Sequence, residues 1–398
     1  MHKVLVLTSR YPYPVIGGDR LRIYHICKAL SKRYELTLAS LCDRPAELRH
    51  RPTDHVFAHI HRVYMPKWKS YSNVLRALPN GLPLQLAYYK SEEFRQLVAA
   101  LLPGHDMVLA HLIRTAQFVP QDTDTFRVLE MTDAISMNYE RMKSLPETYS
   151  WKKLLYRVEQ KRVGRYESAA LDRFDKTWLV SDVDAHYVDG WHENVEVIPN
   201  GVDRDRLPYL DGGRGNVVAF IGNMVSAQNQ DGCLHFAQRI LPRIREQEDI
   251  RLRVIGNCPL PLQRRLERIT GVEVTGMFDR IEEHLQNVFC GVCSVRAAAG
   301  IQNKVLEYLA MGLPCVTTAQ GAEGIHGRPD QHFLLYRSEL EATRHVLSVY
   351  RKPELRQRLA RAGKDLISSE YDWDRLYRRI RDSVADLLEA PSLVRRAG

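Results

Sequence analysis

Short apolar, β-branched segments alternate with longer helical patterns along the whole chain of 398 residues, and this alternation restricts the possible folds strongly. It is typical of βαβ units, which assemble into parallel sheets covered by helices. Because 398 residues exceed what one hydrophobic core usually supports, we expect two domains of similar size. The predicted fold class is therefore α/β, with two Rossmann-like domains.

Both halves of the chain carry the pattern. The strands predicted in the first half are Val4–Thr8, Glu35–Leu41, Met107–Ala110, Arg127–Met131 and Thr177–Val180, with helices near Arg20–Ser31, Glu92–Leu102 and Trp151–Ala170. The strands predicted in the second half are Val195–Ile198, Val217–Ile221, Leu252–Ile255, Val272–Thr275, Gly291–Val295 and Cys315–Thr317, with helices between them.

A turn-forming stretch from Asp211 to Asn216 precedes a new strand, so we expect a hinge close by. We predict domains at 1–190 and 191–372, followed by a C-terminal helical segment, 373–398, that can cross back onto the first domain. Two open α/β sheets in tandem direct the carboxyl ends of their strands toward an interdomain cleft, where ligands bind in such folds.

Cysteine usage and hydropathy indicate the compartment. Seven unevenly spaced cysteines do not form a disulfide framework and fit a reducing, cytoplasmic environment. Cys290 and Cys293 have redox-motif spacing, but they fall in an apolar run that predicts a buried strand. No apolar run reaches about eighteen residues and no signal peptide is evident, so we expect a chain that is neither secreted nor membrane-spanning.

The formal charge of +9 is compatible with nucleic acid, a membrane surface or anionic small molecules. The basic residues do not alternate with stacking aromatics on a recognisable module, which argues against nucleic acid. A predicted helix that contains Trp151, Leu154 and Leu155 also carries the cations Lys152, Lys153, Arg157, Lys161 and Arg162. This helix either presents a solvated basic face or contacts an anionic bilayer as a peripheral membrane element.

The segment from Arg296 to Pro314 carries the clearest chemistry. A predicted strand leads into a turn at Gly300 and then into a helix that ends before Gly312. Free amides at the start of that helix form an anion site. Glu307 lies on an otherwise apolar helix and needs a partner, which is either the hydroxyls of a ribose or Lys304, three residues earlier.

Four segments together resemble the retaining GT-B glycosyltransferases of the glycosyltransferase family 4 type, and especially the sugar transferases of bacterial exopolysaccharide clusters. They are Pro14-Val15-Ile16-Gly17-Gly18, Val197-Ile198-Pro199-Asn200-Gly201-Val202-Asp203, Gly300 to Gly312, and Glu323-Gly324-Ile325. They occur in the family's order and span nearly the whole chain.

The resemblance implies GT-B architecture, with an acceptor-binding first domain and a second domain that binds the nucleotide sugar. It implies transfer of the sugar from a nucleoside diphosphate donor, a UDP- or GDP-sugar, with retention of configuration and without metal or cofactor. A glycan or polyprenyl-linked saccharide is the expected acceptor. Glu307 corresponds to the family glutamate that contacts the ribose. The other donor-binding residues implied are Asn200, Gly222, Gly300, Ile301 and Gln302.

The chain also departs from the family pattern. Ala299 occupies the position of the glutamate that contacts the sugar, and Asn223 and Gln228 replace the usual arginine and lysine that hold the diphosphate. A departing nucleoside diphosphate carries about two negative charges that need cations or amides. We therefore expect Lys304 and Arg296 to supply this charge, and Glu323, as the nearest spare carboxylate, to approach the donor sugar.

In the first domain, the candidates follow the predicted strands. Gly17 and Gly18 let the backbone approach a ligand closely, and they are expected to help bind the donor. The remaining candidates are His111, with a catalytic role toward the sugar, and Arg20 and Asp133, with roles in acceptor binding. His111 is otherwise a structural, hydrogen-bonded histidine and Asp133 a helix N-cap. Arg22 is expected to face solvent.

Two other functions are compatible with the same architecture. One is a non-hydrolysing nucleotide-sugar epimerase. The other is a catalytically degenerate, transferase-like partner subunit, which Ala299, Asn223 and Gln228 make credible.

Overall fold

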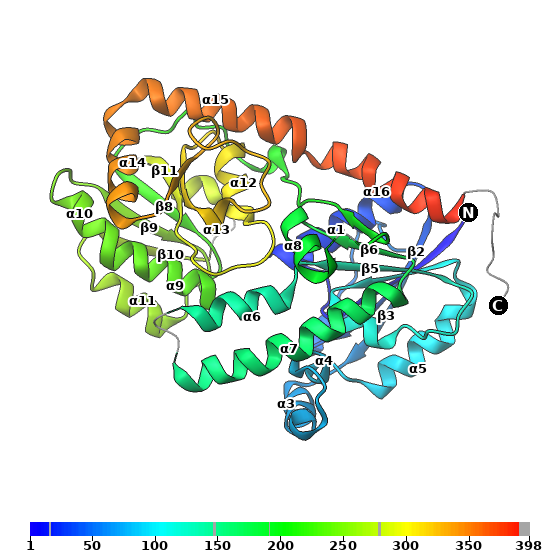
Figure 1. Ribbon diagram of the computed structural model, residues 1–398. Coiled ribbons are helices and arrows are strands. Elements are labelled where there is room, and N and C mark those ends of the chain that lie inside the picture. The colour runs from blue at the N-terminus through cyan, green and yellow to red at the C-terminus, as the bar shows by residue number, and fades with distance from the viewer. Residues whose placement is uncertain (16, 146–148, 191, 278–279, 390–398) are drawn as a thin grey trace. The chain divides into compact units, whose positions relative to one another are not determined.

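The computed structural model describes residues 1–15, 17–145, 149–190, 192–277 and 280–389. It divides into two compact units (Figure 1). Among the described residues, unit 1 contains the chain up to Ser144, the stretch that ends at Pro199 and the C-terminal segment from Asp374, and unit 2 contains Leu145 and Asn200–Trp373. Ile16 and the stretch 390–398, which belong to predicted segments, lie outside the described residues.

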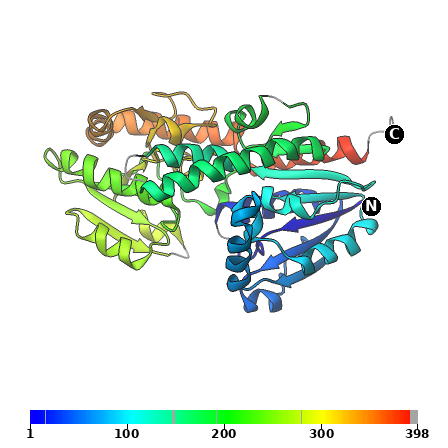
Figure 2. The ribbon, with the colours of Figure 1, turned by 60° about the horizontal axis from the view of Figure 1, so that its bottom comes forward.

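Unit 1 is built on a parallel sheet (Figure 2). Its strands among the described residues, in spatial order, are β3 (His59–Tyr64), β2 (Glu35–Cys42), β1 (Lys3–Thr8), β4 (Met107–His111), β5 (Phe126–Thr132), β6 (Lys176–Leu179) and β7 (Val195–Val197). Central strands such as β1 and β4 are buried along nearly their whole length, which explains why they read as continuous apolar runs.

Serine side chains cap the N-termini of two helices of unit 1. Ser91 caps the helix that follows it by accepting a hydrogen bond from the Phe94 amide, and Ser181 does the same for Asp184. The helices of this unit are α1 (Gly18–Leu30), α2 (Pro45–Arg49), α3 (Lys67–Ala77), α4 (Leu84–Tyr88), α5 (Glu92–Leu101), α6 (Ile135–Ser144), α7 (Ser150–Arg173), α8 (Asp182–Asp189) and α16 (Trp373–Leu388).

Unit 2 has a second parallel sheet. Its strands among the described residues, in spatial order, are β10 (Val272–Gly276), β9 (Arg251–Ile255), β8 (Val217–Ile221), β11 (Val288–Cys293), β12 (Cys315–Thr318) and β13 (Leu334–Tyr336). Its α-helices are α9 (Ala227–His235), α10 (Leu241–Arg245), α11 (Leu260–Glu267), α12 (Asn303–Ala310), α13 (Ala319–Ala322), α14 (Glu339–Arg351) and α15 (Pro353–Glu370).

The core of unit 2 lies between the sheet and its helices. Phe220, Phe236, Leu252 and Phe289 are fully buried there. Cys290 and Cys293 are also buried and unoxidised in β11, as predicted from the apolar run around them. No helix within the described ranges is long and apolar enough to cross a bilayer.

The predicted α/β fold class is confirmed, two predicted strands need correction, and two strands of the described residues were not predicted. The strand expected to open the second sheet, Val195–Ile198, is β7 and closes the first sheet beside β6. The strand expected at Gly291–Val295 begins earlier, at Val288. β3 and β13 were not predicted, because β3 is half-exposed and polar and β13 has three residues. Such edge strands give a weak apolar signal.

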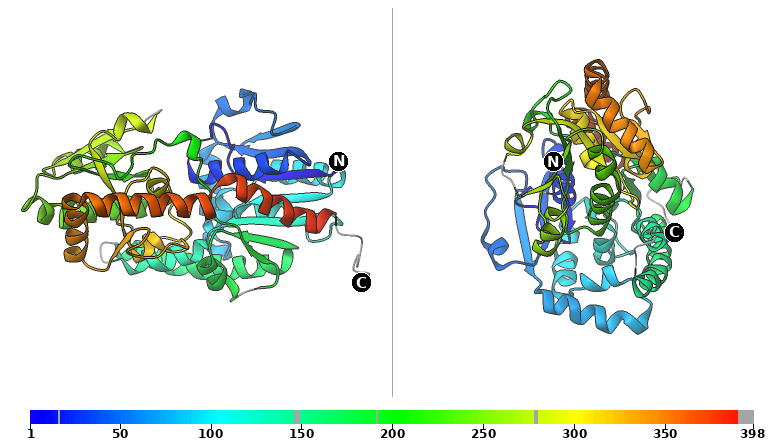
Figure 3. Two further views of the ribbon diagram at one scale, coloured as in Figure 1. Left: turned by 90° about the horizontal axis from the view of Figure 1, so that it is seen from above. Right: turned by 90° about the vertical axis from the view of Figure 1, so that its left-hand side faces the viewer.

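The C-terminal segment returns to unit 1, as the sequence suggested. The Trp178 indole donates a hydrogen bond to Ser383 Oγ at 3.0 Å, and His25 Nδ1 lies 2.6 Å from the Tyr377 hydroxyl. Figure 3 (left) shows α16, in red, lying along this unit.

Candidate functional site

Each sheet has a topological switch point, where the chain order reverses. In unit 2 it lies between β8 and β11, since β9 and β10 extend the sheet to one side and β12 and β13 to the other. Ligands of open α/β sheets bind outside the carboxyl ends of the strands at such a point. The loops that follow β8 and β11, together with helix α12 after the second loop, contain most of the predicted donor residues.

Lys304 lies in the first turn of α12 and is almost fully buried. Its ammonium donates to Asn229 Oδ1 at 2.8 Å and to Gln302 Oε1 at 3.2 Å, and it lies 5.6 Å from the centre of the Phe220 ring. These partners are all neutral. Within the described chain, Lys304 forms no ion pair with a carboxylate, so its charge remains available to an anionic ligand.

Glu307 lies one turn further along α12 and is partly exposed. Its carboxylate has no hydrogen-bond or ion-pair partner among the described residues, so the alternative in which it pairs with Lys304 is wrong. Burial raises the pKa of Glu307, and the Lys304 ammonium opposes that shift. A carboxylate without a protein partner can accept hydrogen bonds from two hydroxyl groups of a ligand.

The start of α12 adds backbone donors to this arrangement. Gly300 has a φ of 68°, which favours glycine, and the turn it makes leads through the buried Ile301 and Gln302 into the helix. Gln302 is the N-cap residue but its side chain makes no capping hydrogen bond. Asn200 donates to Asn303 Oδ1 at 2.8 Å, which holds Asn200 beside this helix start.

Arg296 is placed differently from the expectation. Its guanidinium binds Asp231 in α9 with two hydrogen bonds, Nε to Oδ2 at 3.0 Å and Nη2 to Oδ1 at 2.6 Å. This pair fastens the loop after β11 to α9, so the charge of Arg296 is already balanced within the protein. Its predicted role toward the diphosphate stays a prediction.

The other predicted donor residues lie at the same sheet edge. Gly222 follows β8, and its amide donates to Ile255 O at 2.9 Å. A Cβ at Gly222 would lie 3.2 Å from the Asn229 amide, so glycine leaves room for the side chain that holds Lys304. Ala299 is buried in the loop after β11, and Glu323 directly follows α13, after β12.

Two residues of this site were missed by sequence reasoning. Asn229 holds Lys304, and Asp231 holds Arg296; both lie on α9. Asn229 directly follows Gln228, which replaces the family lysine. In the sequence, Asn229 and Asp231 are an amide and a carboxylate two residues apart, near the start of a helix that follows a glycine turn. This pattern is too common to identify a site.

In unit 1 the switch point lies between β1 and β4, and the predicted residues cluster around it. Gly17 has a φ of 97° and precedes α1, and a Cβ there would lie 4.0 Å from Asp19 Oδ1, an ordinary contact. Gly18 is the first residue of α1. Arg20 donates to Glu47 Oε1 at 3.3 Å, so it is engaged within the protein, while Arg10 lies 3.4 Å from Asp19.

His111 ends β4 and is buried against Glu130 of β5, with Nδ1 2.5 Å from Oε2. Arg22 donates to the other oxygen of Glu130 at 2.5 Å, and Arg22 is 1% exposed. The expectation that Arg22 faces solvent is therefore wrong: its charge is neutralised inside the unit by a carboxylate that the sequence analysis did not consider.

Asp133 follows β5 and is partly exposed. Within the described residues its carboxylate has no hydrogen-bond partner. Desolvation by the surrounding protein, with a contribution from Asp184, raises the pKa of Asp133 to about 7. A carboxyl group with this pKa can accept or release a proton near neutral pH.

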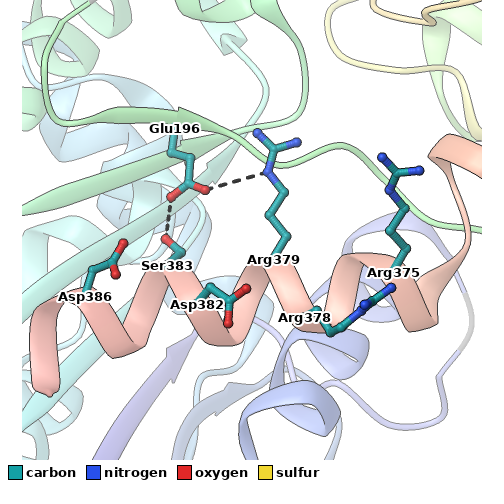
Figure 4. A pocket seen from close by; sticks show the side chains of 7 residues that line it. All are labelled: Glu196, Arg375, Arg378, Arg379, Asp382, Ser383 and Asp386. Atoms are coloured by element: carbon teal, nitrogen blue, oxygen red, sulfur yellow. Dashed lines mark hydrogen bonds and ion pairs between the residues drawn. The ribbon is translucent and has the colours of Figure 1, made fainter.

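A surface pocket of about 530 Å³ lies along α16 in unit 1 (Figure 4). Its lining consists of Glu196, Arg375, Arg378, Arg379, Asp382, Ser383 and Asp386. Glu196 forms an ion pair with Arg379 at 3.7 Å and accepts a hydrogen bond from Ser383. None of the predicted site residues lines this pocket, so it is separate from the two switch points.

Residues 215–350 match the family described as Glycosyl transferases group 1. None of the curated protein sequences matches the chain. The family match covers β8 through most of α14, which includes Gly222, Lys304 and Glu307.

Solved structures share the fold at low sequence identity. A sucrose-phosphate synthase from Thermosynechococcus elongatus has a TM-score of 0.74 at 13% identity, over 98% of this chain and 100% of that one. Anabaena HepE in complex with UDP-glucose has a TM-score of 0.66 at 13% identity, over 97% and 100%. Trehalose 6-phosphate synthase from Burkholderia multivorans has a TM-score of 0.66 at 12% identity, over 98% and 100%.

The chain therefore has the two-unit α/β fold seen in GT-B glycosyltransferase structures, and its residues 215–350 match the glycosyl transferases group 1 family.

Proposed function

We propose that this protein is a metal-independent, retaining glycosyltransferase that transfers a sugar from a nucleoside diphosphate donor to a glycan or lipid-linked acceptor. The observation that carries the proposal is on α12: a buried ammonium held only by neutral groups and a carboxylate without a protein partner, one turn apart at the switch point of unit 2. A nucleoside diphosphate offers an anion to the first and a ribose diol to the second.

Each group then has a distinct task. Lys304 and the free amides at the start of α12 neutralise the diphosphate as its charge grows during departure. Glu307 orients the nucleoside through the ribose hydroxyls. Gly222 and Gly300 keep the backbone close to the phosphates. HepE, which shares the fold, is known in complex with UDP and with UDP-glucose, and this supports a uridine nucleotide as the first donor to test.

The sequence does not identify an aspartate or glutamate as a nucleophile. The proposed chemical step therefore uses no nucleophile from the protein. The bond from the anomeric carbon to the diphosphate oxygen breaks, and its electron pair stays on the leaving group. The acceptor hydroxyl attacks from the same face, and its proton passes to the departing phosphate oxygen. Configuration is thereby retained without an enzyme-bound intermediate. His111 and Asp133, at the sheet edge of unit 1, are the proposed contacts to sugar and acceptor, with Arg20 less favoured because it binds Glu47.

The biological setting forms part of the same proposal. We place the enzyme in bacterial polysaccharide or exopolysaccharide assembly, at the cytoplasmic side, where nucleotide sugars are made. A polyprenyl-linked acceptor would bring it to the inner face of the membrane, through the basic helix near residues 151–165.

Calorimetry with UDP and with uridine tests the donor site. Glu307→Gln is expected to weaken both ligands by about ten- to a hundredfold, because both carry the ribose diol. Lys304→Met is expected to weaken UDP by a similar factor and to leave uridine unchanged, because uridine has no phosphates. Glu283→Gln and Lys352→Met, at exposed positions of unit 2, are the matched controls. Equal loss of both ligands in Lys304→Met would remove the assignment of Lys304 to the diphosphate.

Incubation with a donor and no acceptor separates transfer from the alternatives. A transferase leaves the donor intact or hydrolyses it slowly, whereas an epimerised donor detected by NMR would contradict the proposal. Failure of the wild-type chain to bind UDP, GDP or their sugars would instead identify a degenerate partner subunit. With a productive acceptor, an anomeric proton coupling in the product that matches the donor would establish retention.

A further inference from the structure

α3 presents an apolar stripe to solvent. Trp68, Tyr71, Leu75 and Leu78 are 72%, 60%, 68% and 50% exposed, and their spacing of three, four and three residues puts them on one side of the helix and its 3₁₀ extension. The buried residues of α3 are the small Ser70 and Ala77. A surface helix ordinarily buries its apolar side, whereas α3 exposes its apolar side to solvent and buries its small residues.

The first half of α7 shows the same reversal. Trp151, Leu154, Leu155 and Val158 recur at helical spacing and are 64%, 63%, 37% and 39% exposed, and Tyr149 just before the helix is 69% exposed. Buried positions in α7 begin only at Glu159. Exposed apolar residues gathered in this way mark an interaction surface, whereas single ones do not.

Direct contacts join the two helices in unit 1. Arg162 of α7 donates to the carbonyl of Leu78 at 3.2 Å, at the end of the α3 stripe. Glu159 of α7 accepts from the Leu84 amide at 2.7 Å, at the start of α4. Figure 1 shows α3 at the lower edge of unit 1, with α4 between it and α7.

The two helices themselves carry mainly cationic side chains, and one nearby carboxylate, Asp43, lies 4.0 Å from Lys67. α3 contains no acidic residue, and its cations are Lys67, Lys69 and Arg76. From Ser150 to Arg165, α7 has a single carboxylate, Glu159, which is buried and bonded to Leu84 and Arg162. Its cations in that stretch are Lys152, Lys153, Arg157, Lys161, Arg162 and Arg165.

Aromatic and cationic groups are also in contact with one another. The Lys152 ammonium lies 5.5 Å from the Trp151 ring centre and 5.9 Å from that of Tyr149. Rings with polar edges beside long-stemmed cations suit the boundary between lipid headgroups and acyl chains.

We propose that α3 and the first half of α7 form one membrane-binding face of unit 1, in which the exposed rings and leucines insert into the headgroup boundary of an anionic bilayer. This goes beyond the donor site and rests on none of its residues. It extends the contact proposed for residues 151–165 by a second helix, α3, with its own exposed apolar side chains. A second copy of the chain is a less suitable occupant, because two such faces would bring like charges together.

Sedimentation with vesicles tests the face. Wild-type protein is expected to bind vesicles of phosphatidylcholine with phosphatidylglycerol, to ignore phosphatidylcholine alone, and to be released by salt. Trp68→Ser with Leu75→Ser is expected to weaken binding by about tenfold or more, and Lys152→Glu with Lys153→Glu by a similar factor. Leu340→Ser, at an exposed leucine between two glutamates in unit 2, should bind like the wild type.

The three outcomes that overturn the proposal are distinct. The first is failure of the wild-type protein to bind anionic vesicles, and the second is unchanged binding by the variant that combines Trp68→Ser with Leu75→Ser. A dimer in analytical ultracentrifugation that these substitutions dissociate would assign the face to a second copy. Because all four substituted side chains are on the surface, a thermal unfolding curve that matches the wild type confirms that each variant is folded. UDP binding by the variants is expected to be unchanged. The membrane-binding proposal can therefore fail without affecting the proposed donor site.

Discussion

At the scale of single residues, Tyr308 shapes the switch point of unit 2. Its ring covers Gly291 so closely that a Cβ there would lie 2.4 Å from a ring atom. Its hydroxyl accepts a hydrogen bond from the Ile221 amide at 2.7 Å and lies 3.1 Å from the Ala219 carbonyl, to which it can donate. Tyr308 therefore bonds to the carboxyl end of β8 from the same helix that carries Lys304 and Glu307.

Tyr308→Phe is expected to lower the free energy of unfolding by about 1–3 kcal/mol, because the buried Ile221 amide loses its acceptor. Tyr350→Phe is the control, since the Tyr350 hydroxyl makes no hydrogen bond within the described residues. Urea denaturation of the two variants gives the comparison. Equal stabilities would show that the hydroxyl is not needed.

In unit 1, the buried residue near the switch point that binds its neighbours is Glu130. It is fully buried between Arg22 and His111. Glu130→Gln is expected to destabilise unit 1 by about 3–5 kcal/mol, because it leaves the buried Arg22 without its carboxylate. Glu35→Gln, which removes a partly exposed partner of Lys3, should cost about 1 kcal/mol or less. Thermal unfolding measures the stability of both variants. Similar losses of stability in the two would contradict the role of Glu130 as the buried partner of Arg22.

The same carboxylate predicts acid sensitivity. Burial alone would raise the pKa of Glu130, but Arg22 and His111 outweigh it and bring the pKa to about 2. Its stabilising contribution is therefore present above about pH 4.5 and is lost as the pH falls toward 2. We expect the difference in stability between wild type and Glu130→Gln to shrink over that window. A constant difference would argue against the pairing.

At the scale of secondary-structure elements, α6 and α7 pack closely around a buried acid. The Glu167 carboxyl on α7 accepts a hydrogen bond from the Ser136 amide of α6 at 3.3 Å and a short one from its hydroxyl. Burial raises the pKa of Glu167 to about 8, against these hydrogen bonds. The folded protein therefore holds a proton at this site that the unfolded chain releases above about pH 4.5.

Because of this bound proton, the contribution of Glu167 to stability should fall as the pH rises from about 4.5 to about 8. Glu167→Gln keeps an acceptor for Ser136 and removes the titration. We expect the variant to gain stability relative to the wild type across this window in thermal unfolding, while Glu93→Gln, at an exposed site on α5, follows the wild type. Parallel pH profiles for Glu167→Gln and wild type would refute this.

At the scale of the whole molecule, the return of the chain to unit 1 is the main feature. α16 is separated from the rest of that unit by all of unit 2 in sequence, yet Ile380 is fully buried and Ser383 binds the Trp178 indole. Unit 1 is therefore complete only after the last described helix has been made.

Ile380→Ala is expected to destabilise unit 1 by about 2–5 kcal/mol, because it leaves a cavity under α16. Asp386→Ala, an exposed substitution on the same helix, should have little effect. Hydrogen exchange can localise the loss: amides of β6 and β7 should exchange faster in Ile380→Ala, while those of β8 and β9 in unit 2 keep their protection. A uniform increase across both sheets would contradict the assignment of α16 to unit 1.

The sequence by itself determined the fold class and most of the strands. Buried parallel strands such as β1, β4 and β8 are continuous apolar runs, and this pattern is local to each segment. The motif on α12 also placed Lys304 and Glu307 one turn apart, because helical spacing fixes which side chains are neighbours.

Partner choice was decided only by the tertiary structure. Whether Lys304 binds Glu307 or Asn229, and whether Arg296 meets a ligand or Asp231, depends on how α9 packs beside the loop after β11. The burial of Arg22 and the exposure of the α3 stripe depend in the same way on long-range packing. Local patterns encode backbone periodicity, whereas the pairing of charges and the exposure of a helix face are set by residues distant in the chain, which no local pattern contains.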